Sequence, residues 1–369
     1  MKKISALLGV LMLMALAACG PKKAGQPTSA SVSTATNTGD YSSFLPNPKP
    51  TDKATALQPY AGVPVRTVRL DSMVMSDPFI YPDTRTHTYY MTGTGGAVWR
   101  SKDLKMWEGP YNVLAIDSTS WTGAHPQVWA AEIHLFRGKF YYFATFTNDA
   151  ITIDVVNGRK IPRRASQIFV SNTIEGPYHT VAPKPLLPAA EATLDGTFCI
   201  DELGHPYIVF CHEWIQNGNG TVEVARLTDD MDEIMGDPYV MFRASDCKWS
   251  AGKDSKGRKS FSPVTDGPFL FNTGTDRLGV IWSTWIDDKY TLAVAYSETG
   301  TLDGPWTQDA RPLLNNDSGH AMIFKSFDGQ QLMSLHRQVM QDGHQVRRPY
   351  LLHVDTSGDY LSIGNEYKP

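Results

Sequence analysis

The feature that most constrains the fold is a hairpin segment that recurs along the chain after about residue 60. Each copy has a polar or charged opening residue, an apolar strand, a turn with Gly, Asp or Thr, and a second strand ending in Thr, Ser or His. The five copies start near residues 75, 128, 194, 265 and 318. No long stretch with helical periodicity lies between them, which is typical of all-β proteins.

A second, shorter element supports this repeat. It consists of Ser, a turn and Gly-Pro-aromatic, and it follows three of the hairpins, at 101–111, 171–181 and 297–307. A two-sheet sandwich would not need five similar units of this length. The repeats therefore predict one all-β domain, a five-bladed β-propeller of four-stranded antiparallel blades.

The N-terminal segment reads as a targeting signal. Residues 1–20 have a Lys-Lys start, an apolar run too short for a comfortable membrane span, and a small-residue exit. The exit, LAAC, resembles a bacterial lipobox, which implies cleavage before Cys19 and lipidation of that residue. An ordinary signal peptide with an incidental cysteine is the alternative.

Three segments follow from these observations: a lipoprotein signal peptide at 1–18, a flexible tether at 19–55 rich in Ser, Thr, Pro, Gly and Ala, and the propeller at 56–369. We expect a lipoprotein of the bacterial cell envelope, in the outer membrane and either periplasmic or surface-exposed. The lipid on Cys19 would be its one contact with the membrane, and we expect a monomer.

Composition limits the partners and the chemistry. The net charge of −4 gives no reason to expect nucleic-acid binding, which normally uses a basic face. No Ser-His-Asp motif such as GxSxG, phosphate loop or dinucleotide fingerprint is apparent. Beyond Cys19 the cysteines are Cys199, Cys211 and Cys247, which we expect to be small buried residues or to form one disulfide, without a catalytic thiol.

Propeller geometry predicts where the polar hairpin ends meet. The innermost strand of each blade starts at one mouth of the central channel, and the second strand returns toward the same mouth. The residues that open the hairpins are Asp77, Glu132, Asp195, Asp266 and His320. The residues that close them include Thr92, Thr94, Thr145, Thr147, 212–214, 283–285 and His336. Several carboxylates would then share one pocket, where a cation or a raised pKa must relieve their repulsion.

Facing carboxylates beside aromatic walls are typical of glycoside hydrolysis. One carboxylic acid protonates the leaving oxygen while a second carboxylate activates water on the other face of the sugar. Trp129, Trp214 and Trp285 lie next to the predicted mouth and are candidates for sugar contact. We also expect Glu132, His212 and His336 to bind substrate.

Five segments in order resemble the blade motifs of glycoside hydrolase family 43, and the resemblance covers nearly the whole chain after the tether. They are SDPFIY, VWAAEIHLFRGKFYYFATF (with Ala131 where the family usually has Pro), LDGTFCIDELGHPYIVF, VTDGPFLF and SGHAMIF. The resemblance implies that Asp77 is the general base and that Asp195 orients the acid and tunes its pKa. It also implies that His320 lies near the axis and near a structural calcium ion, with no cofactor required for the chemistry.

The fourth motif departs from the family pattern. The family's general acid is a Glu in that motif, and here its place is taken by Asp266, which is one methylene shorter. Either Asp266 acts as the acid in a reshaped pocket, or the role has moved to Glu213 at the end of the third hairpin. The sequence favours Glu213 slightly, because partial burial between His212 and Trp214 would stabilise its protonated form.

The resemblance also implies the expected function, which is hydrolysis, with inversion, of furanosidic or xylosidic bonds in oligosaccharides or polysaccharides. The sugar would be an arabinofuranoside, a galactofuranoside or a xyloside. The Glu-to-Asp change at position 266 keeps a second hypothesis open, that of a catalytically silent propeller lipoprotein that binds glycans.

Overall fold

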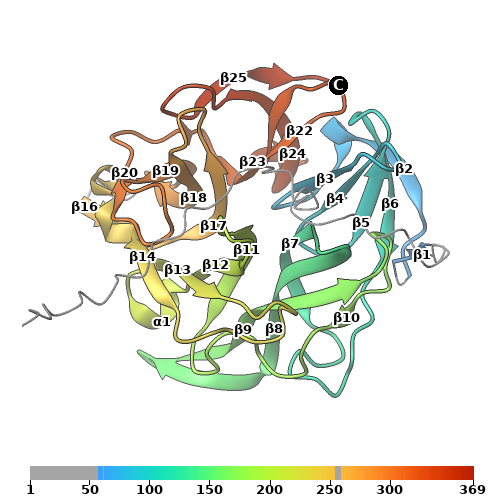
Figure 1. The fold of residues 1–369 in the computed structure, drawn as a ribbon, viewed down its shortest axis with the longest axis horizontal. Coiled ribbons are helices and arrows are strands. Elements are labelled where there is room, and N and C mark those ends of the chain that lie inside the picture. Colours follow the sequence, from blue (N-terminus) through green and yellow to red (C-terminus); the bar gives the residue numbers. More distant parts are fainter. Residues whose placement is uncertain (1–56, 61, 254–258) are drawn as a thin grey trace, which may run out of the picture.

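The computed structural model describes residues 57–60, 62–253 and 259–369. It confirms the predicted all-β architecture: five antiparallel sheets surround a central axis as the blades of a propeller (Figure 1). The predicted signal peptide, the Cys19 lipid anchor and the tether at 19–55 lie outside the described residues. No helix in the described part of the chain has the length and apolar character needed to span a membrane.

Each blade takes its strands from one continuous part of the chain. Blade I contains β3 (Phe79–Asp83), β4 (Thr88–Thr92), β5 (Val98–Ser101) and β6 (Met106–Asn112), with β1 (Gln58–Pro59) and β2 (Arg66–Arg69) paired to β6. Blade II contains β7 (Gln127–Phe136), β8 (Lys139–Val156), β9 (Arg159–Ser171) and β10 (His179–Thr180). Blade III contains β11 (Thr193–Ile200), β12 (Pro206–His212), β13 (Thr221–Arg226) and β14 (Tyr239–Arg243).

The last two blades follow the same order from the axis outward. Blade IV contains β17 (Asp266–Asn272), β18 (Leu278–Ile286), β19 (Lys289–Ser297) and β20 (Trp306–Gln308), with β21 (Leu314–Asn315) also paired to β19. Blade V contains β22 (Ser318–Lys325), β23 (Gln331–Gln341), β24 (His344–Asp355) and β25 (Ser362–Tyr367). The remaining elements are β15 (Ala251–Lys253), β16 (Lys259–Phe261), α1 (Trp214–Asn217) and the short 3-10 helices η2 (Leu70–Ser72), η3 (Ala244–Asp246) and η4 (Lys248–Ser250).

The inner strands of blades II to V begin with the same irregularity: the inner strand has one extra residue opposite the second strand, for example between Leu194 and Thr197 in blade III. In each of these bulges one residue has a positive φ, and so does Asp77, two residues before β3 in blade I. The five residues are Asp77 (58°), Ala130 (46°), Asp195 (55°), Gly267 (52°) and His320 (53°). The mouth of the channel is therefore built from five equivalent left-handed positions, here called the bulge positions, an arrangement that re-aims side chains out of the regular strand alternation.

Among the described strands none is shared between the first and last blades, and packing closes the ring. The inner strands β22 and β3 contact each other, and the backbone N–H of Met75 donates to the carbonyl of Arg347 at 3.0 Å. Side chains of blades I and V form part of one buried cluster, including Met75, Phe79, Ile323 and Leu351. The apolar faces of neighbouring blades thus seal the seam between blade I and blade V.

The three cysteines in the described part of the chain are buried and free. Cys199 lies opposite Tyr207, and Cys211 lies opposite Leu194, so the two thiols do not form a cross-strand pair. Cys199, Cys211 and Cys247 all belong to one hydrophobic cluster between blades III and IV. Of the two expectations from sequence, the structure thus supports small buried residues rather than a disulfide.

Candidate functional site

A cavity of about 380 Å³ lies at the mouth of the channel and takes lining residues from all five blades. The predicted residues that line it are Asp77, Thr94, Trp129, Asp195, Glu213, Trp214, Asp266, Trp285, His320 and His336. The sequence-based prediction of a shared, carboxylate-rich mouth therefore agrees with the structure for ten predicted residues.

Asp77 occupies the bulge position of blade I, just before β3. Its backbone N–H donates to Nδ1 of His336 at 3.1 Å, and the Thr94 hydroxyl donates to its carboxylate. His320 Nδ1 lies 3.3 Å from Oδ1 of Asp77. Burial alone would raise the pKa of Asp77, but His320, His336 and Thr94 outweigh it and hold the pKa well below its usual range. Asp77 is therefore an ionised acceptor at neutral pH.

Asp195 occupies the equivalent position in blade III. Its backbone N–H donates to the Thr145 hydroxyl at 2.7 Å, and its Oδ2 accepts the N–H of Gly267 at 3.0 Å. Burial raises the pKa of Asp195 to about 6, with Asp77 adding to the shift and His320 opposing it. Gly267 can approach this closely because a Cβ there would lie 2.7 Å from the His320 ring, at a φ that favours glycine.

Asp266 opens β17, one residue before the bulge position of blade IV. The Tyr290 hydroxyl donates to its Oδ2 at 3.3 Å. Burial raises the pKa of Asp266 to about 8, and the neighbouring charge of Asp195 contributes to the same shift. Asp266 is thus held protonated at neutral pH, while Asp77 in the same cavity is ionised. Two carboxyl groups with oppositely shifted pKa values are the arrangement that acid–base catalysis uses.

Glu213 follows β12 and precedes α1. Its Oε1 accepts a hydrogen bond from Nη1 of Arg164, and the Arg164 guanidinium lies 4.2 Å from the centre of the Trp129 ring. Burial raises the pKa of Glu213 above its usual range, because the Arg164 charge and hydrogen bond offset it only in part. Arg164 nevertheless occupies Oε1, so Glu213 holds the guanidinium beside the Trp129 ring.

Aromatic rings form the cavity walls. Trp214 is 39% exposed at the rim, and Trp285 lies 5.1 Å from the Tyr290 ring. Tyr290 in turn stacks on His336, with ring centres 5.5 Å apart. Flat apolar faces next to polar groups match the two surfaces of a sugar ring, whose C–H groups contact the rings while its hydroxyls form hydrogen bonds.

Two predicted substrate-binding residues, Glu132 and His212, are absent from the cavity lining among the described residues. Glu132 lies two residues after the bulge position of blade II, Ala130, so it is not equivalent to Asp77 or Asp195. Its Oε2 accepts from Thr197 at 2.8 Å and faces His134 Nε2 at 2.7 Å. The placement of Glu132 at the mouth was therefore wrong, because the bulge changes the strand alternation. His212 instead faces Glu223 and Gln216.

Sequence reasoning missed three residues of the site: Tyr290, Arg164 and Arg347. Tyr290 and Arg347 line the cavity, and Arg164 binds Glu213 from the third strand of blade II. All three lie on third strands, opposite second-strand residues such as Trp285 and Thr147. The only signal for them is cross-strand register, which requires the exact pairing of each hairpin.

The donor atoms around His320 differ from those that a calcium ion prefers. Calcium takes about six to eight oxygen ligands, whereas His320 offers a nitrogen that faces two carboxylates, Asp77 at 3.3 Å and Asp195 at 3.8 Å. Burial alone would lower the pKa of His320, but these carboxylates and Asp266 outweigh it and raise the pKa. Among the described residues His320 is a charge partner of these carboxylates, and the calcium ion near it stays a prediction.

Comparison with known proteins is consistent with this site. Residues 71–355 match the family described as Glycosyl hydrolases family 43. The structure is similar to an endo-arabinase from Bacteroides thetaiotaomicron, with 31% identity, a TM-score of 0.65, and coverage of 77% of this chain and 95% of that one. A search of curated protein sequences finds no match.

Two further solved structures share the fold. An endo-1,4-beta-xylanase from Bacteroides thetaiotaomicron is 24% identical, with a TM-score of 0.63 and coverage of 83% of this chain and 99% of that one. An exo-1,5-alpha-L-arabinanase from a bovine ruminal metagenomic library is 16% identical, with a TM-score of 0.58 and coverage of 80% and 98%.

Proposed function

The chain belongs to glycoside hydrolase family 43 and is a glycosidase, and from this premise we propose that it hydrolyses arabinofuranosidic bonds with inversion of configuration. The observation that carries the mechanism is the pair of carboxyl groups with oppositely shifted pKa values, Asp77 and Asp266, in one cavity. The choice of sugar rests on the similarity to an endo-arabinase at 31% identity.

Asp77 is the general base in this proposal. Its carboxylate removes a proton from a water molecule as the water oxygen attacks the anomeric carbon. His320 and Thr94 keep that carboxylate ionised and fix its direction through the contacts described above. The pKa of Asp77 stays low, so the base limits the rate only in strongly acidic solution.

Asp266 is the general acid in this proposal. Its carboxyl proton passes to the glycosidic oxygen as the bond to the anomeric carbon breaks, which releases the leaving sugar as an alcohol. Asp195 lies beside it, and the negative charge of Asp195 helps to keep Asp266 protonated. This assignment reverses the slight sequence-based preference for Glu213, because Arg164 pairs with that residue.

Water must fit between the base and the sugar for inversion to occur. Inverting glycosidases keep their two carboxyl groups about 6.5–9.5 Å apart, against about 5–5.5 Å in retaining enzymes. A direct test is to follow the anomeric proton of the first-formed product by NMR during hydrolysis of an arabinofuranoside. Release of the same anomer as the substrate would contradict the inverting mechanism.

The acid can be identified with two matched amide variants, Asp266→Asn and Glu213→Gln. Aryl arabinofuranosides with a good leaving group need little protonation, whereas those with a poor leaving group depend on the acid. We expect Asp266→Asn to lose about 10²–10⁴-fold in kcat on the poor leaving group and much less on the good one. Glu213→Gln should affect both substrates alike.

If Glu213→Gln, rather than Asp266→Asn, loses activity selectively on the poor leaving group, Glu213 is the general acid. Turnover of xylosides or galactofuranosides but not arabinofuranosides would overturn the sugar assignment. Binding of arabinan oligosaccharides with no hydrolysis of any of these substrates would instead support the silent glycan-binding protein.

A further inference from the structure

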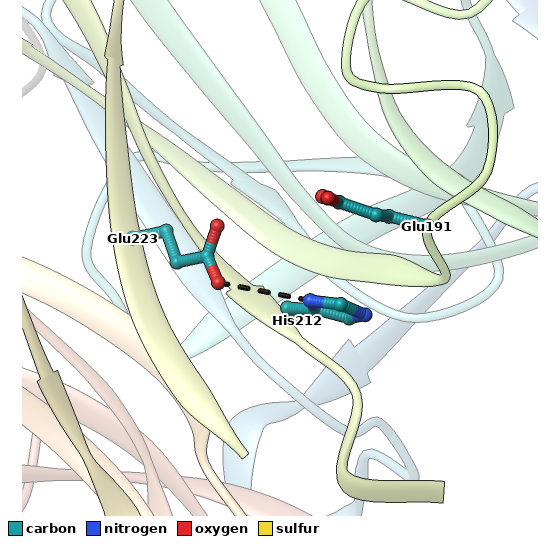
Figure 2. Close-up of side chains that lie close together, drawn as sticks. All are labelled: Glu191, His212 and Glu223. Atoms are coloured by element: carbon teal, nitrogen blue, oxygen red, sulfur yellow. Dashed lines mark ion pairs between the residues drawn. The ribbon is translucent and has the colours of Figure 1, made fainter. Parts of the chain in front are cut away.

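A second cluster of ionisable side chains lies in blade III, outside the cavity lining described above. Glu191 precedes β11, His212 ends β12, and Glu223 lies on β13. One ligand atom from each residue lies within 4.8 Å of the other two. Figure 2 shows the two carboxyl groups and the imidazole directed toward a common space, with each residue coming from a different segment of the chain.

The hydrogen bonds of Gln216 fix the tautomer of His212. The Gln216 amide nitrogen donates to Asp154 at 3.2 Å and to the Ala190 carbonyl at 2.8 Å, which fixes the orientation of the amide. Its Oε1 accepts the N–H of Ala192 at 2.7 Å and faces Nε2 of His212 at 3.1 Å. An amide oxygen cannot donate, so Nε2 of His212 carries a proton, and the lone pair of the neutral ring lies on Nδ1.

Nδ1 of His212 then faces two acceptors. Oε1 of Glu223 lies 3.7 Å from Nδ1, too far for a good hydrogen bond, and is held by the Thr221 hydroxyl at 2.5 Å. Oε2 of Glu191 is buried and has no hydrogen-bond partner among the described residues. Acceptors grouped in this way call for a positive charge, which either a proton on Nδ1 of His212 or a bound cation supplies. Burial alone would lower the pKa of His212, but Glu223, Gln216 and Glu191 outweigh it and raise the pKa.

We propose that Glu191, His212 and Glu223 bind a divalent transition-metal ion, zinc in the first place. Zinc binds histidine nitrogen and carboxylate oxygen at about 2.0–2.2 Å, so ligand atoms around it lie about 3.4 Å from one another. A small inward shift of the two carboxyl groups would bring the ligand atoms, now within 4.8 Å of one another, to this separation of about 3.4 Å. A nitrogen ligand and only three protein ligands favour zinc over calcium, which takes about six to eight oxygens.

The surroundings resemble those of a metal site rather than of a chance cluster. A metal-ligating histidine usually donates its other N–H to an acceptor, and ligating carboxylates are themselves hydrogen-bonded. Gln216 and Thr221 fill these two roles here. Gln216 also binds the backbone on both sides of Glu191, at Ala190 and Ala192, and so positions the third ligand.

The ion would fix the segment that carries part of the catalytic cavity. The backbone N–H of Glu213 donates to the Ala192 carbonyl at 2.9 Å, and Glu213 directly follows His212. Zinc would thus connect the loop at Glu191 to the end of β12, from which Glu213 and Trp214 enter the cavity. The ion acts as a structural clamp and takes no part in bond cleavage.

The experiment measures zinc binding directly, independent of activity. The full chain is purified without a histidine tag, stripped with EDTA and titrated with zinc chloride by calorimetry, and its metal content is measured by mass spectrometry. We expect one zinc ion per chain and a higher melting temperature with zinc. Cobalt(II) in place of zinc should give the visible absorption bands of a site with nitrogen and oxygen ligands.

Three variants separate this site from adventitious binding. Glu191→Gln removes a ligand at a partly exposed loop position and should weaken zinc binding at least about 10-fold, and Gln216→Leu should weaken it by about 10–100-fold. Glu202→Gln makes the same chemical change as Glu191→Gln at an exposed turn of the same blade and should leave affinity unchanged. Absence of zinc binding, or equal affinity in all three variants, would overturn the proposal.

Discussion

Blades I, III and V differ from blades II and IV at one equivalent position. The bulge residues of the first group are Asp77, Asp195 and His320, whose side chains line the cavity, whereas the second group has Ala130 and Gly267. All five residues have the same left-handed backbone. The backbone conformation therefore belongs to the fold, and the side chain at the bulge position decides whether that residue lines the cavity.

This comparison limits what a strained backbone can reveal about function. Non-glycine residues with positive φ cluster at active sites, and of the four non-glycine bulge residues three, Asp77, Asp195 and His320, line the cavity. Ala130 is the fourth, and it has the same conformation without a side chain that could do chemistry. A bulge position with positive φ therefore indicates where the mouth of the channel lies. The side chain at that position indicates whether the residue can take part in the chemistry.

The largest expected effect comes from replacing the blade I residue. Asp77→Asn keeps the size and tolerates the left-handed backbone, but it cannot accept the proton of the attacking water. We expect kcat on an aryl arabinofuranoside to fall by about 10²–10⁴-fold, with the melting temperature near that of the wild type. Activity within a few-fold of wild type would remove Asp77 from the mechanism.

The carboxyl group of blade IV should make stability depend on pH. The pKa of Asp266 is raised to about 8 in the folded protein, against about 3.9 in the unfolded chain. The native state holds a proton that the unfolded state has lost, so the stabilisation is full below about pH 4 and disappears as the pH rises to about 8. The slope from this one group is at most about 1.4 kcal/mol per pH unit.

Urea unfolding at several pH values in this window checks that dependence. Asp266→Asn carries no titrating proton, so its free energy of unfolding should vary less steeply with pH than that of the wild type. Parallel curves for the two proteins would show that the folded-state pKa of Asp266 is close to its ordinary value.

The carboxylate of blade II should be structural. Glu132 binds Thr197 and His134, so Glu132→Gln should lower the free energy of unfolding by about 1–3 kcal/mol and leave KM unchanged. Trp129→Ala, which changes a cavity residue of the same strand, should raise KM instead. A raised KM in Glu132→Gln at unchanged stability would restore its predicted role in substrate binding.

The smallest effect on activity is expected at the bulge position of blade II, where Ala130 has no side chain that could do chemistry. Ala130→Gly removes a Cβ from a residue with φ of 46°, which relieves about 1–2 kcal/mol of strain but also raises the entropy of the unfolded chain. We expect a gain of at most about 1 kcal/mol and unchanged activity. Asp195→Gly makes the equivalent backbone change in blade III and should lose activity. A clear drop in melting temperature for Ala130→Gly would contradict this.

The sequence predicts the fold well because each hairpin repeat corresponds to one blade of the propeller. The five hairpins give the blades, and the hairpin ends give ten of the residues that line the cavity. The equivalence of the hairpin starts fails at Glu132, which stands two residues after its bulge position and leaves the cavity lining. Asp266 stands one residue before its bulge position and still lines the cavity. A strand pattern of period two cannot show a bulge, so it cannot show which face a residue takes beyond it.

Pairwise contacts between blades are also invisible in the sequence. Arg164 reaches Glu213 from another blade, and this ion pair is what favours Asp266 as the acid. The cluster of Glu191, His212 and Glu223 combines residues from a loop and two strands whose spacing matches no short metal motif. The packing of blade II on blade III, the register of β12 and β13, and the loop before β11 together bring these groups close.

Because the catalytic base lies at the seam between the first and last blades, activity depends on contact between these two blades. Asp77 belongs to blade I, whereas His320 and His336, which neighbour its carboxylate, belong to blade V. Any opening of the ring at this seam separates the base from these neighbours while each blade keeps its own strand pairing. During denaturation the rate of turnover therefore reports contact between blades I and V, whereas circular dichroism reports the strand structure within each blade. Activity should disappear at a lower denaturant concentration than the circular dichroism signal.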